Sequence, residues 1–211
     1  PQINKYYLYN SWSLLAKQIK DYKNSDSLNG LAYKAALKLD DKSYLLNVLI
    51  NKSILYSAQG NYKEAVRIIK EVSKKAGDYN LVSHQLLSYQ NLGTYYIDMQ
   101  LYDSALFVYA KLNDLLDENS SPELVMDLYN NMGVVYENQR NYKAAEKNYM
   151  LAIELARKHN NLNDLLIYLQ NYSAIKYMQN DYKVALEYLN EYINLKDTLF
   201  DAEKFGILKN L

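Results

Sequence analysis

Apolar residues recur at helical spacing along most of the chain, in stretches of roughly 16 residues that short polar turns separate. One stretch begins at Pro122 and the next at Tyr142. Their apolar faces consist of Leu124, Leu128, Met132 and Val135, and of Tyr142, Ala145, Tyr149, Ala152 and Ala156. Only Gln139, Arg140 and Asn141 lie between the two faces where the phase breaks, so the pattern predicts two antiparallel helices joined by a tight turn.

This helical pair repeats every 40 residues. The clearest marker is a tyrosine at the start of the second helix, which recurs as Tyr22, Tyr62, Tyr102, Tyr142 and Tyr182. The same shift relates three further columns, which are Ala65, Ala105, Ala145 and Ala185; Asn51, Asn91, Asn131 and Asn171; and Ser53, Gly93, Gly133 and Ser173. One pair cannot bury both of its faces, whereas stacked pairs can, so we predict an all-α solenoid.

We expect about five antiparallel pairs. Residues 1–41 are predicted to form a divergent N-terminal pair that acts as a cap. Residues 42–196 are predicted to form four repeats of 40 residues, and residues 197–211 the start of a C-terminal helix. Because the chain begins at Pro1 without a methionine, we also expect it to be a piece of a longer protein.

The columns resemble the tetratricopeptide repeat. In that family the first helix carries a bulky residue, then Leu-Gly and a tyrosine, and the second helix carries an alanine, an aromatic residue and a second alanine. The fourth pair matches with Tyr129, Met132, Gly133, Tyr136, Ala145, Tyr149 and Ala152, and the third with Tyr89, Leu92, Gly93, Tyr96, Ala105 and Tyr109. The resemblance implies a right-handed superhelix whose concave groove is lined by the first helices, and it implies partner binding rather than catalysis.

A second, shorter resemblance concerns residues 195–204. They are similar to the segment that leaves the last repeat in membrane-anchored bacterial regulators, where a long helix, a transmembrane span and a cytoplasmic output module follow. Apolar residues keep helical spacing here, at Leu199, Ala202, Phe205, Leu208 and Leu211. The resemblance implies the periplasmic side of a membrane-anchored protein, with a cytoplasmic location as the alternative.

Composition narrows the chemistry. Lysine plus arginine and aspartate plus glutamate are both 24, so no net basic charge attracts nucleic acid or an anionic membrane. Cysteine is absent and only His84 and His159 occur, which excludes thiolate sites and multi-histidine metal centres. No nucleotide-binding glycine motif, zinc-protease motif or nucleophile elbow occurs. We therefore expect no enzyme, no cofactor, no metal, no bound nucleic acid and no membrane span in this chain.

The asparagine column is the sharpest candidate binding feature. By the resemblance, Asn51, Asn91, Asn131 and Asn171 fall on the lining of the groove. An amide side chain offers two donors and an acceptor, so a row of amides can pair with the backbone of an extended peptide. The alternative is that each asparagine bonds the adjacent helix and sets the geometry of the repeat.

Neighbouring positions extend the predicted groove. Further amides are expected at Gln90, Asn130 and Gln170. Specificity is expected from residues one helical turn away, of which we single out Asn47, Asp98, Asp127, Glu137 and Tyr177. The repeated lysines and arginines that clamp a terminal carboxylate in chaperone-binding relatives are not found at these positions, so we do not expect such a clamp.

Three functions stay open from the sequence. The favoured one is a protein- or peptide-binding module that forms the extracytoplasmic sensor or scaffold of a bacterial membrane-anchored transcriptional or signalling regulator. The second is a cytoplasmic peptide-responsive regulator or adaptor with the same groove. The third is a self-assembly module, in which copies dimerise through the C-terminal helix.

Overall fold

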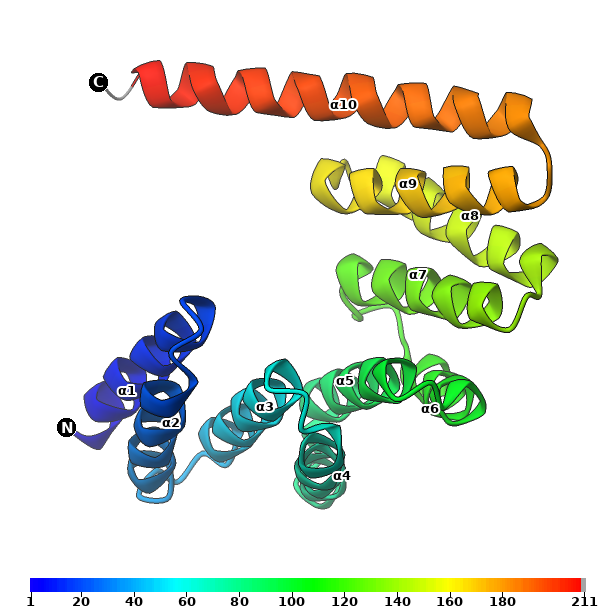
Figure 1. Ribbon diagram of the computed structural model, residues 1–211. Coiled ribbons are helices and arrows are strands. Elements are labelled where there is room, and N and C mark those ends of the chain that lie inside the picture. The colour runs from blue at the N-terminus through cyan, green and yellow to red at the C-terminus, as the bar shows by residue number, and fades with distance from the viewer. Residues whose placement is uncertain (210–211) are drawn as a thin grey trace. The chain divides into compact units, whose positions relative to one another are not determined.

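The chain folds into helices alone, within the residues that the computed structural model describes, which are 1–209 for the backbone and 1–201 for the side chains (Figure 1). The helices are α1 (Gln2–Gln18), α2 (Tyr22–Ala36), α3 (Ser43–Ala58), α4 (Tyr62–Asp78), α5 (Val82–Asp98), α6 (Tyr102–Leu115), α7 (Pro122–Asn138), α8 (Tyr142–Lys158), α9 (Leu162–Met178) and α10 (Tyr182–Lys209). Consecutive helices pair as antiparallel hairpins, which confirms the predicted all-α hairpin repeat. Among the described residues, no helix combines the length and apolar character that a membrane span needs.

The helices form two compact units, the N-terminal unit (Pro1–Leu116) and the C-terminal unit (Asp117–Leu211). The N-terminal unit contains α1 to α6 and the C-terminal unit contains α7 to α10. The sequence predicts one uninterrupted stack, so the division after Leu116 is a feature that the 40-residue period does not announce.

The break coincides with an irregular segment between α6 and α7. After α4 and α8 a residue with positive φ, Asn80 or Asn160, closes the second helix before the next hairpin begins. The equivalent position here is Ser120, and Pro122 follows as the first residue of α7. Proline disfavours helical backbone in the residue before it, and Ser121 is accordingly extended, with ψ of 139°. Leu116 is extended as well, so the last turn of α6 is missing.

The turn inside each hairpin is also repeated. Its left-handed residue recurs every 40 residues, at Lys20, Gly60, Gln100, Arg140 and Asn180. The backbone N–H one residue later closes the helix end, as Asn141 does by donating to the carbonyl of Tyr136 at 2.8 Å. The turn is therefore set by its backbone hydrogen bonds, and it accepts side chains that rarely take a positive φ.

The first hairpin shares the register of the fifth. Ser13 Oγ donates to the carbonyl of Ser25 at 2.8 Å, and Ser173 Oγ donates to the carbonyl of Ala185 at 2.8 Å. The two bonds are equivalent, because both residues of one are 160 positions from those of the other. The divergent N-terminal pair thus keeps the packing of a repeat although its sequence matches weakly.

Large rings and glycines are matched across each central hairpin. A Cβ atom added to Gly93 would lie 2.2 Å from Tyr109 Cε1, and one added to Gly133 would lie 2.5 Å from Tyr149 Cε1. In the second hairpin, Ser53 occupies the position of the glycine, and the smaller Ile69 occupies the position of the tyrosine. The glycine therefore makes room for the ring, and the two positions vary together within this one chain.

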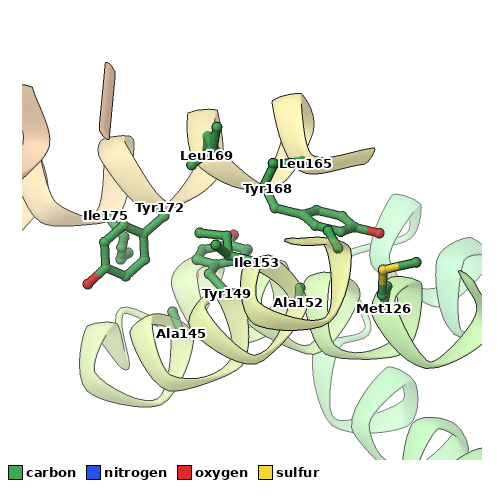
Figure 2. Packing of buried hydrophobic residues seen from close by; sticks show 11 residues of the cluster. Met126, Ala145, Tyr149, Ala152, Ile153, Leu165, Tyr168, Leu169, Tyr172 and Ile175 are labelled. Atoms are coloured by element: carbon green, nitrogen blue, oxygen red, sulfur yellow. The ribbon is translucent and has the colours of Figure 1, made fainter. Parts of the chain in front are cut away.

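The core of the C-terminal unit is a layer of side chains between α8 and α9 (Figure 2). Tyr149 and Ile153 on α8 meet Tyr168, Tyr172 and Ile175 on α9. All five are buried. Burial of such large side chains supplies the main stabilisation of the stack, on the order of 2 kcal/mol for each one.

Candidate functional site

A hollow of about 440 Å³ lies across the first helices of three hairpins in the N-terminal unit. Four of the predicted residues line it: Asn47 and Asn51 from α3, and Gln90 and Asn91 from α5. Apolar side chains lie between them, including Ile50 and Leu87. The hollow therefore combines amide donors and acceptors with small apolar contacts, as a site for an extended chain requires.

Two of the four column asparagines bond an asparagine on a neighbouring hairpin. Asn51 Nδ2 donates to Asn10 Oδ1 at 2.9 Å, and Asn171 Nδ2 donates to Asn130 Oδ1 at 2.9 Å. Each bond joins the first helices of two neighbouring hairpins, so these two asparagines fit the alternative that the column sets repeat geometry. Asn91 instead donates to the carbonyl of Leu87 in its own helix at 2.8 Å.

The column is divided between the two units. Asn51 and Asn91 belong to the N-terminal unit, and Asn131 and Asn171 belong to the C-terminal unit. All four are half-buried. The groove that the structure outlines contains the first two asparagines, and a binding role for the whole column stays a prediction.

Asn47 is held by neighbouring polar side chains. Its Oδ1 atom lies 3.1 Å from His84 Nε2 of α5, which positions the amide at the edge of the groove. Burial lowers the pKa of His84, and the nearby Asp41 carboxylate only partly opposes this. The histidine is thus a positioning neighbour of the groove.

The acidic residues predicted to give specificity have internal partners in the C-terminal unit. Tyr149 Oη donates to Glu137 Oε2 at 2.6 Å, and Tyr168 Oη donates to Asp127 Oδ1 at 3.2 Å. Burial, and next the bond to Glu137, raise the pKa of Tyr149. These carboxylates therefore orient core tyrosines. Asp98, by contrast, is exposed on α5, and desolvation raises its pKa.

Gln170 and Tyr177 lie elsewhere, on an apolar surface of α9 and α10. Together with Met178, Leu186 and Leu189 they line a hollow of about 650 Å³. Its lining is almost entirely apolar, which the sequence prediction of a polar groove does not include.

A third hollow, of about 610 Å³, was not predicted from the sequence. It lies in the N-terminal unit between α4 and α6 and is floored by α5. Its walls carry Lys70, Lys74 and Lys111, which the repeat pattern places on outward-facing second helices. A comparison of side-chain size between equivalent positions of the repeats could have predicted it, because several lining residues are smaller than their equivalents in the C-terminal unit.

The positions of possible metal-ligating side chains bear on whether the chain holds an ion site. Within the described part of the chain, no group of three or more histidine, aspartate or glutamate residues is placed to hold an ion.

The arrangement defines a class of protein: a helical-hairpin repeat with hollows on its helix faces. Residues 124–198 match the family model described as tetratricopeptide repeat. This match, together with the helical hairpins of the remaining residues, supports the tetratricopeptide-repeat family for this chain. None of the curated proteins compared with the chain matches it.

Solved structures share the fold at low identity. The apo form of RapI is 21% identical, with 97% of this chain and 76% of that chain covered and a TM-score of 0.80. Aspartyl phosphate phosphatase F from Bacillus subtilis is 18% identical, with 100% and 56% covered and a TM-score of 0.81. A Rap protein complexed with Competence and Sporulation Factor is 14% identical, with 92% and 55% covered and a TM-score of 0.80. At these identities the likeness concerns the fold.

Relatives of this fold are typically interaction modules, yet one of the three is by name a phosphatase. The expectation that this chain is not an enzyme therefore stays a prediction. This chain spans little more than half of that protein, so a whole-protein activity is not carried over.

Proposed function

We propose that the chain is a protein- or peptide-binding module whose site is the groove across α1, α3 and α5. The observation that carries the proposal is the convergence of Asn47, Gln90 and Asn91 around one hollow with apolar residues between them. The Rap protein with the same fold was solved in complex with Competence and Sporulation Factor, which supports a binding role for such a surface.

In the wider protein, we propose that this module forms the sensor or scaffold part of a bacterial membrane-anchored regulator, on the periplasmic side. Support comes from α10, which continues for 28 residues where the other second helices have 14 to 17. A cytoplasmic peptide-responsive regulator or adaptor is the alternative. Fractionation of cells that express the full-length protein separates the two locations.

A double substitution tests the groove. Peptides selected from a displayed random library against the wild-type chain provide the probes. We expect Gln90→Ala with Asn91→Ala to weaken their binding at least tenfold, because two amide side chains are lost from one wall. Fluorescence anisotropy measures the affinity and circular dichroism checks the helicity.

The matched control is Asn138→Ala, an exposed asparagine on α7 that lies outside the groove. It should leave peptide affinity unchanged. Equal affinity of the double variant and the wild type would refute the groove as the site.

A second candidate function, self-assembly, is favoured by the two ends of the repeat. On α1, Leu8, Trp12 and Leu15 are 49%, 59% and 58% exposed. The residues 160 positions later, Tyr168, Tyr172 and Ile175, are the ones that α9 buries against α8. The α1 face is therefore one half of a repeat interface that has no partner helix within the described chain.

The other half of such an interface is exposed on α10. Leu189 and Ile193 are 39% and 44% exposed, and they are equivalent to Tyr149 and Ile153, which α8 buries against α9. We propose that α1 of one copy packs on α10 of another and continues the stack. A contact of this head-to-tail kind uses two different surfaces, so it propagates unless it closes into a ring.

Sedimentation velocity tests this assembly. Trp12→Asp with Leu15→Asp removes the first face, and Leu189→Asp with Ile193→Asp removes the second. We expect each variant to be monomeric where the wild type associates, and an equimolar mixture of the two to form dimers through the one intact pair of faces. A monomeric wild type, or a mixture that stays monomeric, contradicts the proposal.

A further inference from the structure

The hollow between α4 and α6 exists because of small residues at three repeat-equivalent positions. Gly77, Leu92 and Val108 line it, and the residues 80 positions later in the C-terminal unit are Arg157, Tyr172 and Tyr188. The difference in side-chain size decides whether the space between two second helices is open or filled.

In the C-terminal unit the equivalent space is bridged by side chains. The rings of Tyr172 and Tyr188 lie 4.4 Å apart between centroids, and Tyr188 Oη lies 3.8 Å from Met150 Sδ. Arg157 on α8 pairs with Glu191 on α10 at 2.8 Å. An ion pair and two rings thus close the gap that the N-terminal unit leaves open.

The walls of the open hollow carry an excess of positive charge. Lys70 and Lys74 come from α4, and Lys111 comes from α6. The residue equivalent to Lys111 in the C-terminal unit is Glu191. Among the residues that line the hollow, Asp103 is the one acidic residue. Within the described chain, none of the three ammonium groups forms an ion pair with a carboxylate. Opposed cations on two walls attract an anion more strongly than a single lysine on a surface does.

Aromatic and aliphatic groups lie beside these cations. Lys111 Nζ is 4.6 Å from the ring centroid of Phe107, and Lys70 Nζ is 5.6 Å from that of Tyr96. Phe107 is 63% exposed, while Leu92 at the floor is buried. The hollow therefore offers an apolar floor with cations at its rim, and its volume is in the range of pockets that hold compact ligands.

From this geometry we infer a second binding site, distinct from the groove, that takes an acidic peptide segment with an aromatic residue between carboxylates. The aromatic side chain enters between Leu92 and Val108, and the flanking carboxylates pair with Lys70, Lys74 and Lys111. On α5 the residues that line this hollow and those that line the groove occupy opposite faces, so the two sites do not overlap. This inference does not depend on the groove.

A fluorescein-labelled peptide with a phenylalanine between aspartates is the probe, and anisotropy measures its binding to the full chain. We expect Lys74→Glu with Lys111→Glu to weaken binding at least tenfold, and added salt to weaken it for the wild type. The matched control is Lys63→Glu with Lys147→Glu, which changes the net charge equally at lysines outside the hollow and should bind nearly as the wild type does.

A shape variant and a second peptide complete the test. Val108→Tyr should fill the hollow as Tyr188 does in the other unit and abolish binding, with unchanged helicity. A peptide with glycine in place of phenylalanine should bind far more weakly. Equal affinities for the charge-reversed variant and its control, or for the two peptides, would overturn the site. Competition by free phenylacetate as strong as by the peptide would overturn the assignment to a peptide.

Discussion

Replacing Gly133 with serine is expected to destabilise the C-terminal unit by about 3 kcal/mol, because the new side chain overlaps a core ring. Tyr149 is fully buried, and its hydroxyl is held by Glu137, so the ring has nowhere to retreat. A Cβ atom at this position would lie 2.5 Å from the ring. Urea unfolding followed by circular dichroism measures the loss.

The repeat itself suggests the rescue. The second hairpin has Ser53 and Ile69 where the fourth has Gly133 and Tyr149. Tyr149→Ile alone leaves a cavity and removes the partner of Glu137, so it is also destabilising, by about 3 kcal/mol. In the double variant the two losses should not add, and we expect a coupling free energy of about 2 kcal/mol between the positions.

Gly30→Ser is the matched control for this experiment, because a Cβ atom there would meet nothing within 4 Å. It should change stability by no more than about 0.5 kcal/mol, and in the stabilising direction that helix propensity predicts. Trp12, the one tryptophan, reports on the N-terminal unit by fluorescence. Additive losses in the double variant would contradict the matching of ring and glycine.

The second large effect is expected at the ion pair of Lys176 and Glu146. Lys176 is 9% exposed and occupies the position of Tyr96 in the N-terminal unit. Burial is the largest single influence on the pKa of Lys176 and lowers it, but the hydrogen bond to Glu146 and the charges of Tyr172, Glu146 and Asp181 together raise it above its ordinary value. Glu146→Val leaves the ammonium group with Asp181 at 4.0 Å, and we expect a loss of about 3 kcal/mol.

Transplanting the apolar pair of the N-terminal unit should restore stability. Val66 and Tyr96 stand there in the same relation as Glu146 and Lys176, and both pack against the core. We expect Glu146→Val with Lys176→Tyr to match or exceed the wild type in urea unfolding, because well-packed apolar groups replace buried ion pairs without loss.

The control for the ion pair is the exposed one between Arg157 and Glu191, whose side chains are 42% and 41% exposed. Glu191→Val should cost no more than about 1 kcal/mol. A loss at Glu146 no larger than at Glu191 would show that burial of Lys176 contributes nothing to the pair.

Most of the fold was predictable from the sequence, because the 40-residue period and the helical spacing of apolar residues fix the hairpins. Each tyrosine of the marker column, from Tyr22 to Tyr182, begins a helix as predicted. The division after Leu116 was not predictable from the period. The division coincides with extended backbone at Leu116 and Ser121, and the segment between them keeps the 40-residue spacing of the repeat.

The candidate site was predictable only in part. The resemblance to the tetratricopeptide repeat placed Asn47, Gln90 and Asn91 on the groove lining, and all three line the hollow of the N-terminal unit. The pairing of Asn51 with Asn10 was not foreseen, because it depends on how close two first helices approach. The lysine-lined hollow was not predicted because it depends on the small side chains at Gly77 and Val108. Motifs of reactive or polar residues give no indication of such a space.

The segment before the proline of α7 differs from the other turns in conformation but not in length. The segment between Leu116 and Pro122 departs from the compact turns of the other repeats without adding or removing a single position. The repeat register therefore continues unbroken from Ala105 to Ala145, although the backbone between them takes a different course. A sequence alignment by repeat length alone would thus join two units that the structure separates.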